Sequence, residues 1–221
     1  MKKRILILLS LVAMLQAGWA QKTMVSTNRP MVSTDRLVES IRQRYTEMKE
    51  YVASHTGQDL YDGADFGEYY HLEARQWLPA TGGHIEDTYL FWGEVEGDAE
   101  EIYPRHYVKF VTKKFNYAAR NYYQEFLYDA DGHVAFIYAY DPMLKLEGDA
   151  DDMQYEFRFY LNKGRLIKAI VKSKHYDQQE YQQVWSGSTI KPVYQSNFDD
   201  YIDVARTMRT LFINIEKEAY M

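Results

Sequence analysis

Two successive hairpin patterns between residues 121 and 174 constrain the fold more than any other part of this 221-residue sequence. The first reads NYYQEFLY, DADG, HVAFIYAY, and the second reads MQYEFRFYL, NKG, RLIKAIVKSK. In both, apolar residues alternate with others on either side of a turn that ends in glycine, Gly132 or Gly164. This pattern is typical of antiparallel strands joined by short turns. The segment therefore predicts four consecutive strands of one sheet.

The second hairpin predicts a sheet with one dry face, because alternate side chains of a strand point to opposite faces. The dry face would hold the apolar set Tyr155, Phe157, Phe159, Leu161, Ile167, Ala169 and Val171. The other face would hold Glu156, Arg158, Lys168 and Lys172, with Tyr160, Leu166 and Ile170 among them. We expect this second face to be mostly solvated.

The first hairpin predicts a different surface, one that is crowded with aromatic rings and has no Lys or Arg. Its opposite face would hold Tyr123, Leu127, Ala135, Ile137 and Ala139. A solvated face does not need so many rings, so we expect a helix of the same chain, a partner or a ligand to cover it. Together with Trp92 from an earlier strand, the aromatic residues of this face are the candidate ligand-binding residues: Tyr122, Phe126, Tyr128, Phe136, Tyr138 and Tyr140.

Amphipathic helices are expected at both ends of the strand region. Residues 35–55 carry apolar side chains three or four positions apart, and residues 199–216 do the same. Between them we expect strands at 69–77, 85–95 and 107–115, the two hairpins, and a short strand or helical turn near 181–185. The sequence thus predicts an α+β fold in which two helices flank an antiparallel meander of about six or seven strands. It leaves open whether the helices cover one face of the sheet or both.

The N-terminus has the three parts of a secretory signal peptide. Lys2, Lys3 and Arg4 precede an apolar run from Ile5 to Leu15, and the small residues Gly18 and Ala20 follow. We expect cleavage after Ala20 and a periplasmic or secreted location. The run is too short to span a bilayer comfortably, and no later stretch is long enough. The signal peptide resembles those of small exported proteins of unknown function from Gram-negative gut anaerobes. The expected organisation is a signal peptide at 1–20, a flexible leader at 21–33 and a single α+β domain at 34–221.

Charge and cysteine content exclude several classes of protein. Loss of residues 1–20 would lower the formal charge from −6 to −9, which disfavours nucleic acid and anionic membranes as partners. The chain has no cysteine, so disulfides, Cys-ligated zinc and lipid attachment through a lipobox cysteine are excluded.

No catalytic or metal-binding motif accompanies the hairpins. The six histidines show no zinc-ligand spacing, and no nucleophile elbow, phosphate loop or dinucleotide turn occurs. The DADG segment at 129–132 has part of a calcium-loop pattern, but Tyr140 stands where the bidentate Glu is needed. Asp and Gly are also what a hairpin turn requires, so we expect a turn, with no metal and no cofactor.

The sequence leaves three functional hypotheses. The first is an exported, non-enzymatic binding module that presents its aromatic sheet face to a glycan or an envelope protein, since tyrosines combine a large apolar ring with a hydroxyl. The second is a carrier of a lipid or another apolar small molecule in a cavity lined by the same residues. The third is a hydrolase with carboxylate or histidine chemistry that the sequence does not locate. The oligomeric state is not indicated.

Overall fold

The computed structural model describes residues 33–55, 68–95, 104–146, 148–149 and 152–219. Residues Thr34–Met221 form one compact unit. The predicted signal peptide and most of the predicted leader lie outside the described residues.

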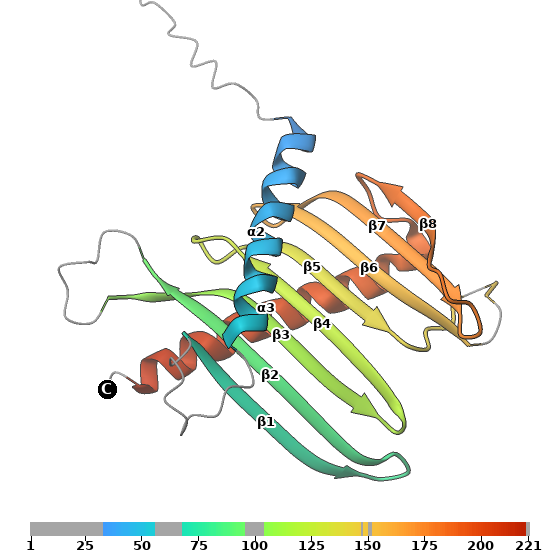
Figure 1. The fold of residues 1–221 in the computed structure, drawn as a ribbon, viewed down its shortest axis with the longest axis horizontal. Coiled ribbons are helices and arrows are strands. Elements are labelled where there is room, and N and C mark those ends of the chain that lie inside the picture. The colour runs from blue at the N-terminus through green and yellow to red at the C-terminus, as the bar shows by residue number, and fades with distance from the viewer. Residues whose placement is uncertain (1–32, 56–67, 96–103, 147, 150–151, 220–221) are drawn as a thin grey trace, which may run out of the picture. The chain divides into compact units, whose positions relative to one another are not determined.

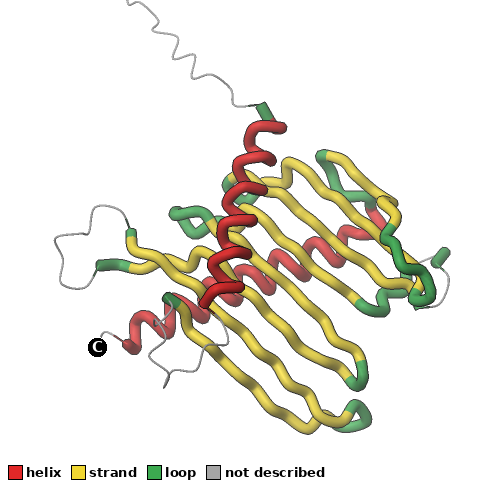
Figure 2. Tube along the Cα trace, in the orientation of Figure 1, coloured by secondary structure: helices red, strands yellow, loops and turns green. Residues whose placement is uncertain are grey.

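One antiparallel sheet of eight strands forms the centre of this unit, and its spatial order is the order of the chain (Figures 1 and 2). The strands are β1 (Tyr69–Leu78), β2 (Gly82–Glu94), β3 (His106–Tyr117), β4 (Arg120–Tyr128), β5 (Val134–Asp141), β6 (Met153–Asn162), β7 (Arg165–His175) and β8 (Gln182–Gly187). The predicted α+β meander with a helix at each end is confirmed. The segment near 181–185 is a strand, which brings the number to eight.

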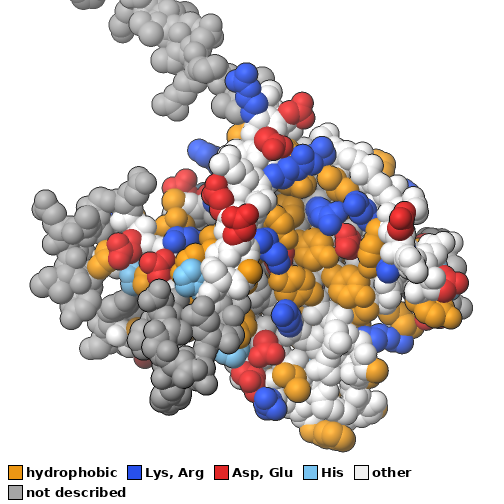
Figure 3. Space-filling view, viewed as in Figure 1, with side chains coloured by type: hydrophobic (Ala, Val, Ile, Leu, Met, Phe, Trp, Pro, Cys, Tyr) orange, Lys and Arg blue, Asp and Glu red, His pale blue; other side chains and the backbone are white. Residues whose placement is uncertain are grey.

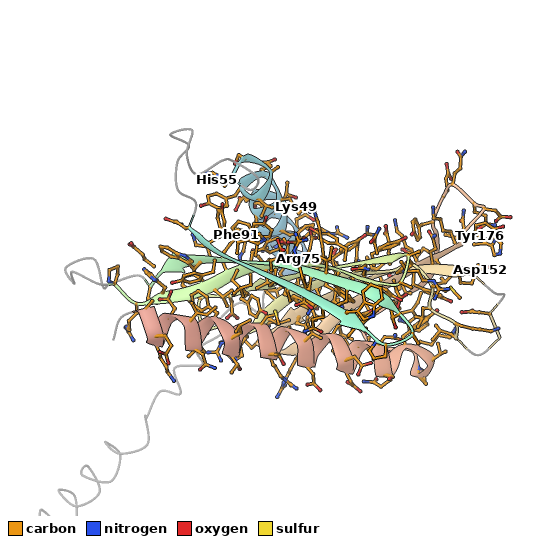
Figure 4. The ribbon with its side chains drawn as sticks, turned by 90° about the horizontal axis from the view of Figure 1, so that it is seen from below. Lys49, His55, Arg75, Phe91, Asp152 and Tyr176 are labelled. Atoms are coloured by element: carbon orange, nitrogen blue, oxygen red, sulfur yellow. The ribbon has the colours of Figure 1, made fainter. Side chains whose placement is uncertain are left out.

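The two helices cover opposite faces of the sheet. Helix α2 (Thr34–His55) lies on one face, and helix α3 (Gln195–Ala219) lies on the other (Figure 4). Helix α3 begins four residues earlier than the sequence pattern predicts, directly after a 3-10 turn at Pro192–Tyr194. We call the two surfaces of the sheet the α2 face and the α3 face.

The larger core lies between the sheet and α3. Phe157 and Phe159 of β6 are completely buried there and pack against Tyr201 of the helix. Ala169 and Val171 of β7 are also completely buried in this cluster. The prediction that the second hairpin has one dry face is therefore confirmed at these positions.

A smaller core lies beneath α2. Val38 and Ile41 of the helix pack over Phe110, Phe136 and Tyr160, and Phe91 and Leu127 belong to the same cluster. Each strand residue comes from the end of the sheet that α2 crosses. The same strands continue past the helix, so part of the α2 face has no described helix over it (Figure 1).

The predicted faces of the first hairpin are wrong. Phe126 pairs with Ile137, and Leu127 pairs with Phe136, so each pair shares a face. The prediction placed Phe126 and Phe136 together and Leu127 and Ile137 together. A bulge between Leu127 and Tyr128 and a turn in which Asp129 N donates to His133 O set this register. Because side chains alternate with a period of two, a shift of one residue exchanges all the faces of a strand.

Candidate functional site

Four of the seven predicted binding residues belong to the α3 side. Phe126 and Tyr128 are fully buried, and the Tyr128 hydroxyl donates to the Ala205 carbonyl of α3 at 2.7 Å. Trp92 stacks on His106 with ring centroids 4.0 Å apart, and Tyr122 stacks on Phe115 at 5.1 Å. Phe126 and Tyr128 are thus core residues under α3.

The other three belong to the α2 side, where their exposure differs along β5. Phe136 is buried beneath α2, 4.7 Å from the ring of Tyr45. Tyr138 and Tyr140 follow on the same face and are only half-buried, because α2 does not extend over them. The structure therefore does not bring the seven residues together, and it leaves Tyr138 and Tyr140 at an accessible surface.

These two residues belong to a group of half-buried tyrosines on the α2 face. Tyr123 of β4 pairs directly with Tyr140, and its ring meets that of Tyr138 edge to face at 6.2 Å. Tyr181, just before β8, lies beside Tyr140, and the interaction between their hydroxyls contributes to the pKa values of both. We call Tyr123, Tyr138, Tyr140 and Tyr181 the tyrosine platform. Figure 3 shows apolar and aromatic side chains gathered on the sheet beside α2, with Lys and Arg side chains around them.

The hydroxyl of Tyr138 is fixed by a charged pair on β6. It donates to the Glu156 carboxylate at 3.2 Å, and the Arg158 guanidinium donates to the other oxygen of that carboxylate at 2.9 Å. Arg158 also lies over the Tyr138 ring, with its guanidinium carbon 5.5 Å from the centroid. Burial, followed by the negative charge of Glu156, raises the pKa of Tyr138. The ring is therefore held neutral, with its hydroxyl as a donor.

A similar arrangement holds the outer end of the tyrosine platform. The Tyr181 hydroxyl donates to the Gln154 side-chain oxygen at 3.3 Å, and the Lys174 ammonium lies 4.9 Å from the Tyr181 ring centroid. Burial is the main cause of the raised pKa values of Tyr140 and Tyr181. Each ring thus has a fixed orientation before any ligand arrives, which reduces the entropy cost of binding.

The inner end of the platform meets a buried carboxylate under α2. Glu125 of β4 has no exposed surface and accepts hydrogen bonds from Tyr45 and Lys49 of α2 and from Tyr123. Figure 4 shows Lys49 on the side of α2 that faces the sheet. Burial and the charge of Glu125 raise the pKa of Tyr45 and of Tyr123. This cluster fastens α2 to the sheet, and it also holds Tyr123 in place.

An open groove of about 520 Å³ adjoins the tyrosine platform at the ends of β2, β3 and β4. Tyr123 and Tyr140 line it, together with polar groups from Asp87, Asn116 and Asn121. The Lys114 ammonium lies 5.8 Å from the Tyr123 ring centroid. The groove therefore combines aromatic rings with donors and acceptors, the composition expected of a site for a polar ligand.

The turn at 129–132 places Asp129, Asp131 and His133 close enough for a shared metal ion. Asp129 already accepts a hydrogen bond from the His133 backbone N–H at 2.8 Å, and Gly132 N donates to the Asp129 carbonyl. Gly132 has a φ of 78°. These features are those of a hairpin turn, as the sequence predicts. Such a turn accounts for the Asp and Gly residues at these positions.

Sequence reasoning missed the polar partners of the platform. Glu125 stands in a strand between apolar residues, and Lys49 belongs to the solvated side of a simple helical pattern. Glu156, Arg158 and Tyr181 were assigned to solvent or to an irregular segment. The available signal was the cross-strand register, because an opposed Glu125–Tyr138 pair requires a common face.

Comparison with protein-family models, with curated proteins and with solved structures found no match. None of the helices in the described part of the chain has the length and apolar character needed to cross a membrane.

Proposed function

We propose that the protein is a non-enzymatic binding module and that the tyrosine platform binds a glycan. The observation that carries this proposal is the state of the four rings: they are half-buried on an α2 face that the helix leaves open, and hydrogen bonds fix the hydroxyls of Tyr123, Tyr138 and Tyr181. Fixed aromatic rings offer flat apolar surfaces to sugar rings, and the neighbouring Gln154, Glu156 and Asn121 offer partners to sugar hydroxyls.

The other two hypotheses receive less support. Phe126, Tyr128 and Phe136, which a carrier would use to line an internal cavity, are packed against the helices. On the tyrosine platform, the Glu125 and Glu156 carboxylates are engaged by Lys49 and Arg158. We therefore favour recognition over transport of an apolar ligand or hydrolysis.

We also propose that the protein is exported, to the periplasm or beyond. The support is the sequence pattern of the first twenty residues, which lie outside the described structure. N-terminal sequencing of the protein recovered from the envelope or the medium of the producing cells tests this point. The proposal predicts Gln21 as the first residue, and a retained Met1 would contradict it.

The binding proposal is tested by separating affinity from stability. Soluble glycans are first screened by thermal shift, where a ligand at a hundred times its Kd stabilises the protein by about 2.7 kcal/mol. Tyr140→Ala should then weaken binding at least about tenfold, while the free energy of unfolding falls by less than about 1.5 kcal/mol. Tyr117 is 46% exposed at the end of β3 and alternates onto the other face, so Tyr117→Ala is the matched control. Equal affinities of the two variants would refute the platform as the site.

A further inference from the structure

We propose that the glycan bound by the tyrosine platform is an acidic polysaccharide, one that carries carboxylate or sulfate groups along a chain of sugar rings. This inference rests on the proposed function and specifies its ligand. Three observations support it: the lysines around the platform, the absence of described carboxylates paired with them, and the acceptors beside them.

Four lysines lie on the α2 face on the two sides of the tyrosine platform. Lys168, Lys172 and Lys174 of β7 pair with Tyr160, Glu156 and Gln154 of β6, and directly opposed residues share a face. Lys114 pairs with Tyr123 in the same way on the other side of the platform. The chain as a whole has a formal charge of −6, so this positive surface runs against its overall charge.

Among the described residues, these lysines have no carboxylate as an ionic partner. Glu156 lies opposite Lys172, but its carboxylate is taken by Arg158 and Tyr138. Within the described residues, no carboxylate lies at ion-pair distance from Lys114, Lys168, Lys172 or Lys174. By contrast, Lys113 and Lys109, elsewhere on β3, each pair with a glutamate. A row of unneutralised ammonium groups beside aromatic rings is complementary to an extended anion.

The groups beside the lysines favour an acidic polysaccharide over other polyanions. Acceptors stand beside the tyrosine platform and next to the lysines: the Glu156 carboxylate and the Gln154 amide oxygen each accept hydrogen bonds from the protein and keep lone pairs for a further donor. A ligand that suits both must carry anionic groups and hydroxyl donors together. Sugar chains with acidic substituents have both, whereas polypeptides rich in glutamate lack the rings and hydroxyls, and nucleic acids have few hydroxyls beside each phosphate.

The extent of this surface suits a polymer. The platform and its lysines run from β3 to β7, four strand spacings of about 4.8 Å, or roughly 19 Å across the sheet. This is long enough to engage several consecutive sugar residues of a polymer. A chain that crosses the strands would pass over the directly opposed Tyr123 of β4 and Tyr140 of β5, with its acidic groups toward Lys114 on one side and Lys172 on the other.

The test compares probes that differ in one property, measured by calorimetry with the purified protein. Polygalacturonate supplies sugar rings with carboxylates, and its fully methyl-esterified form supplies the same rings without charge. Dextran sulfate and dextran form the corresponding sulfate pair. Polyglutamate and a single-stranded oligothymidylate supply negative charge without an acidic sugar chain. We expect binding to at least one acidic polysaccharide and at least about tenfold weaker binding to its neutral counterpart.

Each other outcome has a defined meaning. Equal binding to the acidic and the neutral member of a pair would overturn this inference and leave the proposed glycan function standing. Equal binding to polyglutamate would also overturn it, because sugar rings would not be needed. Equal binding to the oligothymidylate would overturn it too, because a run of hydroxyl-bearing acidic sugars would not be needed. Binding to none of the four polysaccharides would overturn the acidic-polysaccharide inference, and failure of a broader neutral-glycan screen as well would overturn the proposed function.

A charge-matched pair of variants locates the effect. Lys168, Lys172 and Lys174 are replaced together by Gln, and the control replaces Lys163, Arg206 and Lys217, which are exposed on a turn and on α3. Both triple variants lose the same charge. We expect the first to bind polygalacturonate at least about tenfold more weakly at low salt and the control to bind it normally. Equal losses in both variants would show a non-local effect of net charge and would contradict the proposed site.

Discussion

Among the acidic residues of the described sheet, Glu125 is the most deeply buried. Its carboxylate is completely buried, and its hydrogen bonds come from Tyr45, Lys49 and Tyr123. A buried carboxylate is tolerated only where charged or hydrogen-bonding partners replace water. The residue therefore makes the position of α2 specific, since two of its three partners belong to that helix.

Replacement of Glu125 by Gln should destabilise the protein by about 2 kcal/mol, because a neutral amide accepts fewer and weaker hydrogen bonds from the same donors. Glu86, which pairs with Lys113 at 2.7 Å in a partly exposed position, is the control. Glu86→Gln should cost less than about 1 kcal/mol, as exposed ion pairs do. Urea denaturation measures both values. Equal costs would show that Glu125 is not the anchor described above.

Because of the tyrosines near Glu125, the free energy of unfolding should fall as the pH becomes alkaline. Burial raises the pKa of Tyr45 above its ordinary value of 10.0, so a rise in pH ionises this tyrosine in the unfolded chain before the folded one. The unfolded state then binds fewer protons, and the free energy of unfolding falls as the pH rises above about 10. Below that pH, the contribution is fully present.

The Tyr45→Phe variant should show a shallower loss of stability between about pH 10 and about pH 11, by up to ~1.4 kcal/mol per pH unit. The measurement is urea denaturation at a series of pH values. Tyr176, which is 63% exposed, serves as the control, and Tyr176→Phe should leave the slope unchanged. A slope in Tyr45→Phe equal to that of the original protein would contradict the assigned role of burial.

Residues such as Glu125 also show why the site was only partly predictable. The sequence indicated that tyrosines of β5 face something other than bulk water, and Tyr138 and Tyr140 do stand at an accessible surface beside α2. It could not indicate that Lys49, which is 76 positions from Glu125 in the chain, supplies a charge beneath the helix. Contacts of this kind depend on tertiary packing, which leaves no periodic trace in the sequence.

At the scale of elements, the two hairpins differ in their turns. Gly132 and Gly164 have nearly the same backbone conformation, with φ values of 78° and 75°. A Cβ at Gly132 would lie 2.3 Å from the Arg209 Nε, whereas a Cβ at Gly164 would meet nothing within 4 Å. The turn at Gly132 is therefore packed under the Arg209 side chain of α3, and the turn at Gly164 has no such contact.

This pair of glycines provides a matched test. Gly164→Ala should cost about 1 kcal/mol, the strain of a left-handed backbone with a Cβ. Gly132→Ala should cost slightly more, by under about 1 kcal/mol, because the flexible end of Arg209 can move aside. In an Arg209→Ala background, the two substitutions should cost the same, which double-mutant cycles by urea denaturation can establish. A difference that persists without Arg209 would point to another cause.

The strands themselves were predicted well because each hairpin has a local pattern of alternation that its neighbours cannot erase. The faces of the first hairpin were predicted incorrectly, because the number of residues in the turn and at the bulge decides which side chains share a face. The bulge after Leu127 is one such irregularity, and apolar residues on both sides of β4 conceal it. In β6 and β7, charged residues mark one face, so the alternation was assigned correctly away from the turn. Leu166 and Ile167 lie on the faces opposite to those predicted, because the register shifts at Tyr160.

At the scale of the whole molecule, the arrangement follows from the number of apolar faces. The sheet is apolar across one face and apolar at one end of the other, so two helices are needed to cover it. Both helical stripes could be read from the sequence, but the face that each helix takes could not, because either arrangement satisfies the amphipathic pattern. The outcome makes Phe126 and Phe136 core residues of opposite layers and leaves Tyr138 and Tyr140 beyond the edge of α2.

The measurement that tests the central claim most directly is a residue-resolved NMR titration of the isotope-labelled protein with a short polygalacturonate fragment. Amide shifts should change along Tyr138–Tyr140, Gln154–Arg158 and Lys172–Lys174, the strand segments that carry the tyrosine platform and its lysines. Amides of α3, on the opposite face, should remain unchanged. Shift changes confined to α3 and the turns beside it, or no change with any of the polysaccharides, would contradict the claim that this protein recognises its ligand through the α2 face.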